Sequence, residues 1–130
     1  MDTSETYIKQ CKKAKKIQKR VLKEGDYFYD HPFGVQLCWY LGDWRSASIP
    51  YSVNPIWLPR QDQLQEMVSN CKDHNGTLGK GMYLLQKMVD WNISPDGWKS
   101  KVDASSMEQL WLAFVMKEKF NKTWNGEDWG

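Results

Sequence analysis

The stretch from Ser105 to Trp129 constrains the fold of this chain more than any other, because it contains a helix start, an apolar stripe and a helix stop. Ser105 and Glu108 have the spacing of a capping box, in which a hydroxyl and a carboxylate accept hydrogen bonds from the unpaired amides at the helix start. Apolar side chains follow at helical spacing, at Met107, Leu110, Trp111, Phe114 and Val115. The stretch therefore predicts a buried helix in a folded domain, and it carries no catalytic motif.

The composition is that of a folded domain. The chain has 130 residues, of which 41% are hydrophobic, and it contains eight tryptophans, so it can bury a core. No apolar run approaches the roughly 20 residues of a membrane span, and the lysine-rich N-terminus lacks the apolar stretch of a signal peptide. We therefore expect a cytoplasmic protein with no membrane partner, folded as a single domain over residues 1–130.

The N-terminal segment, residues 1–25, reads as a basic amphipathic helix. Its apolar positions advance by three or four residues from Ser4 to Lys23, which predicts a helix of about five turns. Gly25 suits the left-handed conformation that commonly follows a helix. The segment carries eight basic and three acidic side chains, whereas the other 105 residues carry ten basic and thirteen acidic ones. The basic character of the chain is therefore concentrated at this end.

The middle of the chain, about residues 26–58, reads as a small antiparallel sheet. Tyr27–Tyr29 and Val35–Leu41 are strand candidates separated by a reversal that contains Pro and Gly. Alternation in the second strand predicts that Val35, Leu37, Trp39 and Leu41 face the core. Residues 42–55 read as an irregular loop with room for an edge strand, and Ile56–Leu58 is expected to be extended.

Residues 59–130 read as a helical region with three helices. The first runs from Pro59 to about Cys71, the second from Thr77 to about Trp91, and the third is the C-terminal helix. The expected fold class is α+β, with the N-terminal basic helix, the small sheet, and three C-terminal helices packed on it. The expected core residues are Leu37, Trp39, Trp57, Leu64, Leu85, Trp111 and Phe114.

Four blocks are distributed along the chain: YIKQCKKAKKIQK near its start, EGDYFYD after it, IWLPRQDQLQEMV from Ile56 to Val68, and the stretch from Ser106 to Trp129. Together they resemble small uncharacterised proteins encoded by bacteriophages and prophages of Gram-positive bacteria. The resemblance implies a phage accessory protein that acts inside the bacterial host cell. It favours a non-enzymatic binder and brings no catalytic residues to carry over.

The basic segment offers the first candidate contact surface, formed by Lys12, Lys13, Lys16, Lys19 and Arg20. Cations on a helix can contact phosphates and release counterions, which would suit a nucleic acid. Against this, a single arginine among seven lysines provides few bidentate contacts. A solvated helix face and a docking surface for an acidic protein explain the same pattern.

Tryptophans offer the second candidate surface. Trp39, Trp57 and Trp111 lie in apolar patterns and are expected in the core. The tryptophans in loops or at element ends are expected to be partly exposed and to anchor a partner; they are Trp44, Trp91, Trp98, Trp124 and Trp129.

No motif predicts catalysis, a cofactor or a metal site. Gly76–Gly81 lacks the spacing and the leading strand of a phosphate loop, and it reads as a glycine-loosened helical turn. His31 and His74 lie in predicted turns outside any metal-ligand pattern. Three unpaired cysteines, Cys11, Cys38 and Cys71, read as reduced thiols in the core.

Three functions follow as hypotheses. The first is a non-enzymatic protein-interaction module that binds a host or phage protein or associates with itself. The second is a nucleic-acid-associated factor that uses the lysine-rich N-terminal segment. The third is a small enzyme, which would need a cluster of titratable side chains in a pocket.

Overall fold

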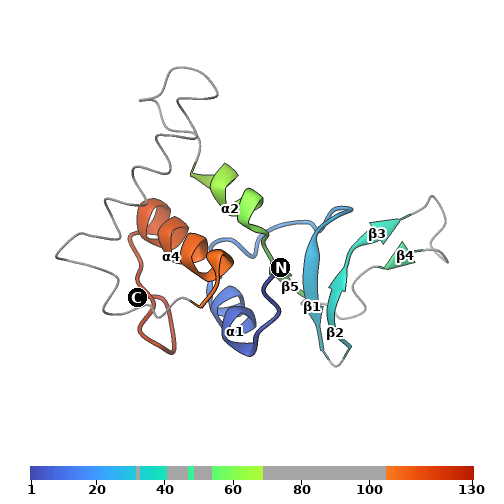
Figure 1. Cartoon of the computed structure of the whole chain (residues 1–130), viewed down its shortest axis with the longest axis horizontal. Helices are drawn as coiled ribbons and strands as arrows, with labels where there is room; N and C mark the ends of the chain where they lie inside the picture. Colours follow the sequence, from blue (N-terminus) through green and yellow to red (C-terminus); the bar gives the residue numbers. More distant parts are fainter. Residues whose placement is uncertain (32, 41–46, 49–53, 69–104) are drawn as a thin grey trace, which may run out of the picture. The chain divides into compact units, whose positions relative to one another are not determined.

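The structure, a computed structural model, describes residues 1–31, 33–40, 47–48, 54–68 and 105–130. These segments form an α+β structure with a three-stranded antiparallel sheet and three helices (Figure 1). The chain divides into two compact units, Met1–Arg60 and Gln61–Gly130, and each is described by itself. Within these segments, no helix has both the length and the apolar character that a membrane crossing requires.

Helix α1 spans Glu5–Lys13 and opens the N-terminal unit. Ser4 caps it, because its hydroxyl accepts a hydrogen bond from the Tyr7 amide at 3.2 Å. Tyr7 and Cys11 are fully buried, as the apolar periodicity predicts. The Tyr7 hydroxyl donates to the Pro59 carbonyl oxygen at 2.6 Å, which ties the helix to the chain that follows β5 (Ile56–Leu58).

The predicted five-turn N-terminal helix is wrong in its second half. Helix α1 ends at Lys13, and a turn follows over residues 15–17. The Gln18 side chain explains the ending, because its amide nitrogen donates to the Cys11 carbonyl at 3.0 Å and to the Trp57 carbonyl at 2.9 Å. These contacts take the chain off the helical path, so tertiary structure outweighs the helical periodicity of the sequence.

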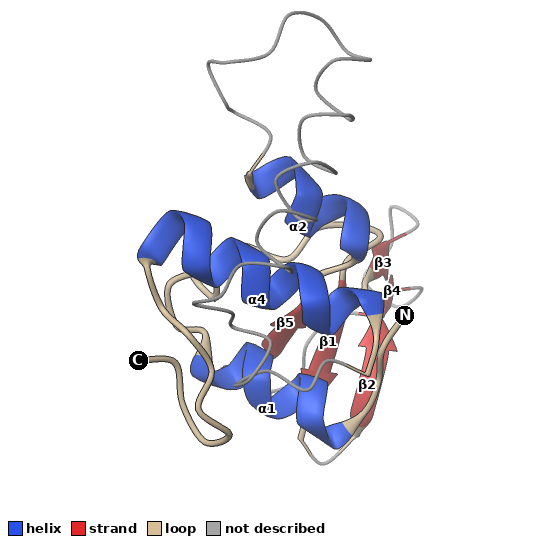
Figure 2. Cartoon of the chain, turned by 60° about the vertical axis from the view of Figure 1, so that its left-hand side comes forward, coloured by secondary structure: helices blue, strands red, loops and turns tan. Residues whose placement is uncertain are grey.

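The sheet of the N-terminal unit has β1 (Tyr27–Asp30) at its centre. Strands β2 (Gly34–Leu37) and β5 pair with β1 on either side, and both pairs are antiparallel (Figures 1 and 2). Phe28 lies opposite Trp57 in the β1 and β5 register, and both side chains are buried. The predicted small sheet is therefore confirmed, and its buried face carries these two aromatic residues.

The predicted inward face of the second strand is wrong. Leu37 and Trp39 are 42% and 37% exposed, whereas Cys38 is buried. The register gives the reason: buried Phe28 lies opposite Gln36, and residues directly opposite each other in an antiparallel pair share a face. Alternation from Gln36 then places Cys38 inside, with Leu37 and Trp39 outside. The alternation along this strand is confirmed, but Leu37 and Trp39, which were predicted to face the core, face outward.

A second, two-stranded sheet follows, formed by β3 (Trp39–Tyr40) and β4 (Ala47–Ser48). Strand β4 lies inside the predicted loop of residues 42–55. Residues 41–46 and 49–53 lie outside the described residues.

Helix α2 of the C-terminal unit spans Gln61–Met67. The predicted start at Pro59 is early by two residues, because Pro59 precedes the helix. Leu64 is fully buried, as expected, and α2 packs against α4 (Met107–Phe120). The other predicted helix, from Thr77 to about Trp91 with Leu85 in the core, lies outside the described residues.

Helix α4 begins one residue later than the predicted capping box. Its cap is Ser106, whose hydroxyl accepts from the Gln109 amide at 3.1 Å. The Gln109 side chain reaches back, and its Oε1 accepts from the Ser105 amide at 3.2 Å. The reciprocal logic of a capping box is therefore present, with Ser106 and Gln109 in place of Ser105 and Glu108.

The middle of α4 is apolar all round. Six consecutive residues, 111–116, are buried, which is typical of a helix enclosed in a core. Trp111 and Phe114 are among them, as predicted, and their rings meet edge to face with centroids 5.6 Å apart.

A short hairpin closes the chain. Helix α4 ends at Asn121, which has a left-handed φ of 53°. Trp124 and Trp129 then form an antiparallel bridge, and the hydrogen bonds of 2.9 and 3.0 Å between the Thr123 and Gly130 backbones extend the pairing. The sequence analysis read this stretch only as a helix stop.

Candidate binding pocket

The predicted lysine contacts lie on the surface of the N-terminal unit. Lys12, Lys13, Lys16 and Lys19 are all exposed. Lys12 and Lys13 belong to the last turn of α1, where cations complement the helix dipole. Lys16 and Lys19 follow in the turn and in the extended chain beyond it. The four lysines therefore lie along a helix end and the chain that leaves it, and not along one long helix.

Arg20, the fifth predicted contact, has a different environment from these lysines. Its Nε donates to Asp26 Oδ2 at 3.0 Å, and its Nη2 donates to Asp26 Oδ1 at 3.2 Å. The Asp26 side chain is only 2% exposed, whereas that of Arg20 is 32% exposed. The guanidinium carbon also lies 4.5 Å from the centroid of the Trp57 ring. Arg20 is therefore held in place by a carboxylate and an aromatic ring.

Gln18 closes the outer edge of β5. Its Oε1 accepts from the Trp57 amide at 2.9 Å, and its Nε2 donates to the Trp57 carbonyl. The side-chain amide therefore makes the two bonds that a neighbouring strand would make, so Trp57 is paired with Phe28 on one side and with Gln18 on the other. This arrangement fixes the chain between α1 and β1.

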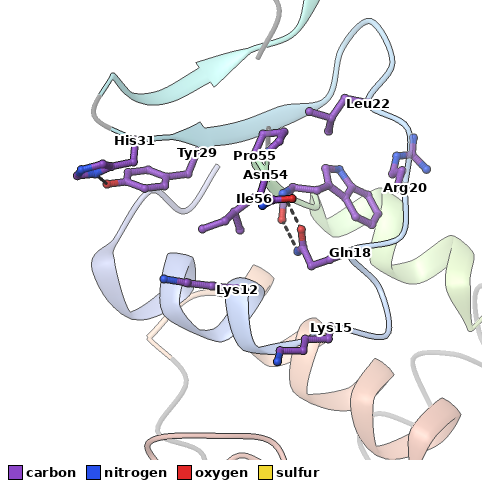
Figure 3. A pocket seen from close by; sticks show the side chains of 11 residues that line it. Lys12, Lys15, Gln18, Arg20, Leu22, Tyr29, His31, Asn54, Pro55 and Ile56 are labelled. Carbon is purple, nitrogen blue, oxygen red and sulfur yellow. Dashed lines mark hydrogen bonds between the residues drawn. The ribbon is translucent and has the colours of Figure 1, made fainter. Parts of the chain in front are cut away.

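A pocket of about 950 Å³ lies in the N-terminal unit, between the end of α1 and the strands β1 and β5 (Figure 3). Among the described residues, its lining includes three cations and no acidic side chain. Lys12 and Lys15 approach from the α1 side, and Arg20 lies at the other end of the view. The remaining lining residues are Gln18, Leu22, Tyr29, His31, Asn54, Pro55, Ile56 and Trp57.

An aromatic pair stands at the rim of this pocket. The Tyr29 hydroxyl and His31 Nδ1 are 3.4 Å apart, and the ring centroids are separated by 6.5 Å. Both side chains point to the same end of the pocket in Figure 3. His31 is exposed, as its position in a predicted turn indicates. The sequence analysis assigned no site role to either residue.

The prediction of exposed tryptophan anchors is wrong for the two members that the structure describes. Trp124 and Trp129 are each 5% exposed. Their rings lie against each other with centroids 5.2 Å apart, because the bridge between the two residues brings them together. The signal for this hairpin was the Asn125-Gly126 pair between two aromatic residues. The other three candidates, Trp44, Trp91 and Trp98, lie outside the described residues.

The two described cysteines are buried free thiols, as expected of small core residues. Burial raises the pKa of the Cys11 thiol, which disfavours the nucleophilic thiolate. The pKa of Cys38 is also raised, first by burial and then by the nearby charges of Asp26 and Glu24. Within the described residues, no three His, Cys, Asp or Glu side chains gather in an arrangement that could hold a metal ion. Cys71 and His74 lie outside those residues.

Comparisons of the chain with protein-family models, with curated proteins and with solved structures found no match.

The pocket lining contains some of the predicted contact residues and not others. Lys12 and Arg20 were among the predicted contacts, and the structure places both in its lining. Lys13, Lys16 and Lys19 are not among the lining residues, whereas Lys15 is. The spacing of the lysines in the sequence does not indicate which of them line the pocket, because this depends on where α1 ends.

Proposed function

We propose that this protein is a non-enzymatic protein-interaction module, and that the outer face of its N-terminal hairpin docks a partner. The carrying observation is the exposed apolar face formed by Phe33, Leu37 and Trp39, which are 56%, 42% and 37% exposed. Leu37 and Trp39 lie two residues apart on the outer side of the extended chain, and Phe33 lies in the adjoining turn. Apolar side chains grouped in this way are typical of an interaction surface.

The alternation of the sequence supports this proposal. Leu37 and Trp39 belong to the set that the hydrophobic pattern assigns to a buried face, and the opposite face is already occupied by Phe28 and Cys38. A partner bound to the outer face would bury Leu37 and Trp39, while Phe28 and Cys38 are already buried on the inner face. The resemblance to phage proteins fits a host or phage protein, or a second copy of the chain, as this partner inside the bacterial cell.

Affinity capture with matched variants tests the proposal. The double variant Leu37→Glu/Trp39→Glu places charges on the apolar face, whereas Val21→Glu places one on an exposed apolar residue elsewhere in the same unit. We expect wild type and Val21→Glu to capture the same bacterial protein, or to self-associate in sedimentation velocity, and the double variant to do neither. All three proteins are expected to have the same thermal midpoint.

Two results would contradict the proposal. One is equal capture and equal self-association by all three proteins, or none by any of them. The other is a thermal midpoint that falls in the double variant alone, because Leu37 and Trp39 would then belong to the core of the protein itself.

The exposed lysines favour a second candidate, a nucleic-acid-associated factor. Lys12, Lys13, Lys16 and Lys19 make no ion pair or side-chain hydrogen bond among the described residues, so their charges are available to phosphates. Fluorescence anisotropy with labelled single- and double-stranded DNA at about 50 and 200 mM salt tests it, since counterion release makes phosphate binding fall steeply over this interval. Affinity that is absent at the lower salt concentration would exclude this candidate.

A further inference from the structure

The pocket of the N-terminal unit has the electrostatic character of an anion site. Lys12, Lys15 and Arg20 line it, and no acidic residue is in its lining within the part of the chain that the structure describes. The nearest carboxylate that contacts a lining cation is Asp26, which is almost fully buried beneath Arg20. Lys12 and Lys15 make no ion pair among the described residues, so their two charges remain available to a bound anion. Lysine is a point charge that suits phosphate oxygens in variable geometry.

Arg20 adds an oriented donor to this charge. Asp26 accepts hydrogen bonds from Nε and Nη2, and the guanidinium carbon lies over the Trp57 ring at 4.5 Å from its centroid. Among the described residues, no hydrogen bond is formed by Nη1, which is the third nitrogen of the same group. A side chain already fixed in this way loses little conformational entropy when a ligand binds.

The rest of the lining fits a flat organic body. Pro55, Ile56 and Leu22 provide apolar surface, and the Tyr29 ring stands beside it (Figure 3). Asn54 is exposed and carries an amide that can donate and accept hydrogen bonds. A volume of about 950 Å³ lies within the range of roughly 300–1,000 Å³ that is usual for small-molecule sites. A simple inorganic anion would leave most of this lining unused.

We propose that this pocket binds a nucleotide. The phosphate lies against Lys12 and Lys15, and the base lies against Tyr29 and Ile56 with its polar edge toward Asn54, while Arg20 adds positive charge at the other end of the pocket. A phosphate monoester carries about −1.5 to −2 charges at pH 7, which the two lysines can neutralise. The base supplies the flat, mostly apolar surface with a polar edge that the other wall accommodates. The ligand is either a free mononucleotide or one nucleotide of a single strand.

Isothermal titration calorimetry with four probes tests the ligand class. The probes are inorganic phosphate, adenosine, adenosine monophosphate and a short single-stranded oligothymidylate. We expect adenosine monophosphate to bind more tightly than either phosphate or adenosine, because only the nucleotide uses both walls. Tighter binding of the oligonucleotide than of the mononucleotide would identify a strand as the source, and the reverse order would identify a free nucleotide. A nucleotide that binds no better than inorganic phosphate, or does not bind, would overturn the proposal.

Charge-matched variants locate the site. Lys12→Gln/Lys15→Gln removes two cations of the lining, whereas Lys13→Gln/Lys16→Gln removes two exposed cations that adjoin it and lie outside it. We expect the first pair to weaken nucleotide binding roughly tenfold or more and the second pair to change it less than about twofold. Equal losses in both pairs would mean diffuse attraction to the basic segment and would overturn the pocket assignment. Because all four lysines are exposed, both variants are expected to fold.

A separate variant tests the contact between the base and the aromatic wall of the pocket. Tyr29→Leu retains apolar bulk and removes the ring, so it should weaken binding of the nucleotide and leave any binding of inorganic phosphate unchanged. An equal effect on both probes would show that the base does not contact this wall. The proposal is independent of the apolar hairpin face, since the Leu37→Glu/Trp39→Glu variant should bind the nucleotide as wild type does.

Discussion

At the scale of single residues, Arg20 shows how one cation among many acquires a structural role. Seven lysines share the N-terminal segment with it, and Arg20 pairs with a buried carboxylate while its guanidinium lies over an aromatic ring. A planar guanidinium can form two parallel hydrogen bonds to one carboxylate while a face covers a ring, and an ammonium group lacks this fork geometry. The scarcity of arginine in this segment counted against a nucleic-acid contact, and the one arginine present has a place in the fold.

The Arg20→Met variant should destabilise the protein by about 2–3 kcal/mol. Removing one partner of a buried ion pair costs roughly 3–5 kcal/mol, and a smaller value is expected because part of the Arg20 side chain meets solvent. Urea unfolding measures the change. Lys19→Met is the control, since it removes a neighbouring exposed cation, and it should cost less than about 0.5 kcal/mol. Equal losses for the two variants would contradict the assigned role of the Asp26 pair.

At the scale of elements, the C-terminal hairpin depends on one residue with an unusual backbone. Gly126 has a φ of 100°, and Asn125 next to it accepts hydrogen bonds on its Oδ1 from the amides of Glu127 and Asp128, both at 2.9 Å. This turn brings Trp124 and Trp129 together.

Gly126→Ala should therefore lower the free energy of unfolding by about 1–2 kcal/mol through backbone strain. No atom lies within 4 Å of an added Cβ at this position, so a steric clash does not contribute. Gly130→Ala is the matched control, because its Cβ also meets open space, and it should leave the free energy of unfolding unchanged. Thermal unfolding followed by tryptophan fluorescence compares the two variants. An unchanged midpoint for Gly126→Ala would contradict the turn geometry.

The elements also show what the sequence could and could not predict. Local signals were sufficient for α4 and for the small sheet, because the apolar periodicity and turn residues of these segments agree with the final fold. The end of α1 could not be predicted, since it depends on Gln18 reaching a strand 39 residues away. The outward phase of Leu37 likewise depends on pairing with Phe28 and its neighbours, which alternation alone does not fix.

The pocket was predictable only in part for the same reason. Lys12 and Arg20 stood out through the charge of their segment. Tyr29 and Asn54 carry no motif, and they enter the lining because β1 and β5 are paired. The pocket is formed by the end of a helix, a pair of strands and a connecting turn. These parts have no fixed spacing in the sequence, so no local pattern could have indicated the pocket.

At the scale of the whole molecule, α4 contains an unbroken run of six buried residues, 111–116. The free energy of unfolding of a chain of this length is expected to be roughly 6–20 kcal/mol. A helix buried on every side along residues 111–116 contributes to this total at each position, unlike an amphipathic helix, which contributes on one face. The largest of these side chains, Trp111, is therefore the position where one substitution should affect the molecule most.

Trp111→Ala should cost about 3–5 kcal/mol, the usual loss for a large aromatic residue truncated in a packed core. Trp111→Phe should cost clearly less, because it keeps an aromatic ring near Phe114 and removes an indole N–H that has no hydrogen-bond acceptor among the described residues. Met107→Ala, at an exposed position of the same helix, should change the free energy of unfolding by less than about 0.5 kcal/mol. Urea unfolding of the three variants measures this order. If the loss for Trp111→Ala were no larger than that for Met107→Ala, the molecule would not depend on a core built around α4.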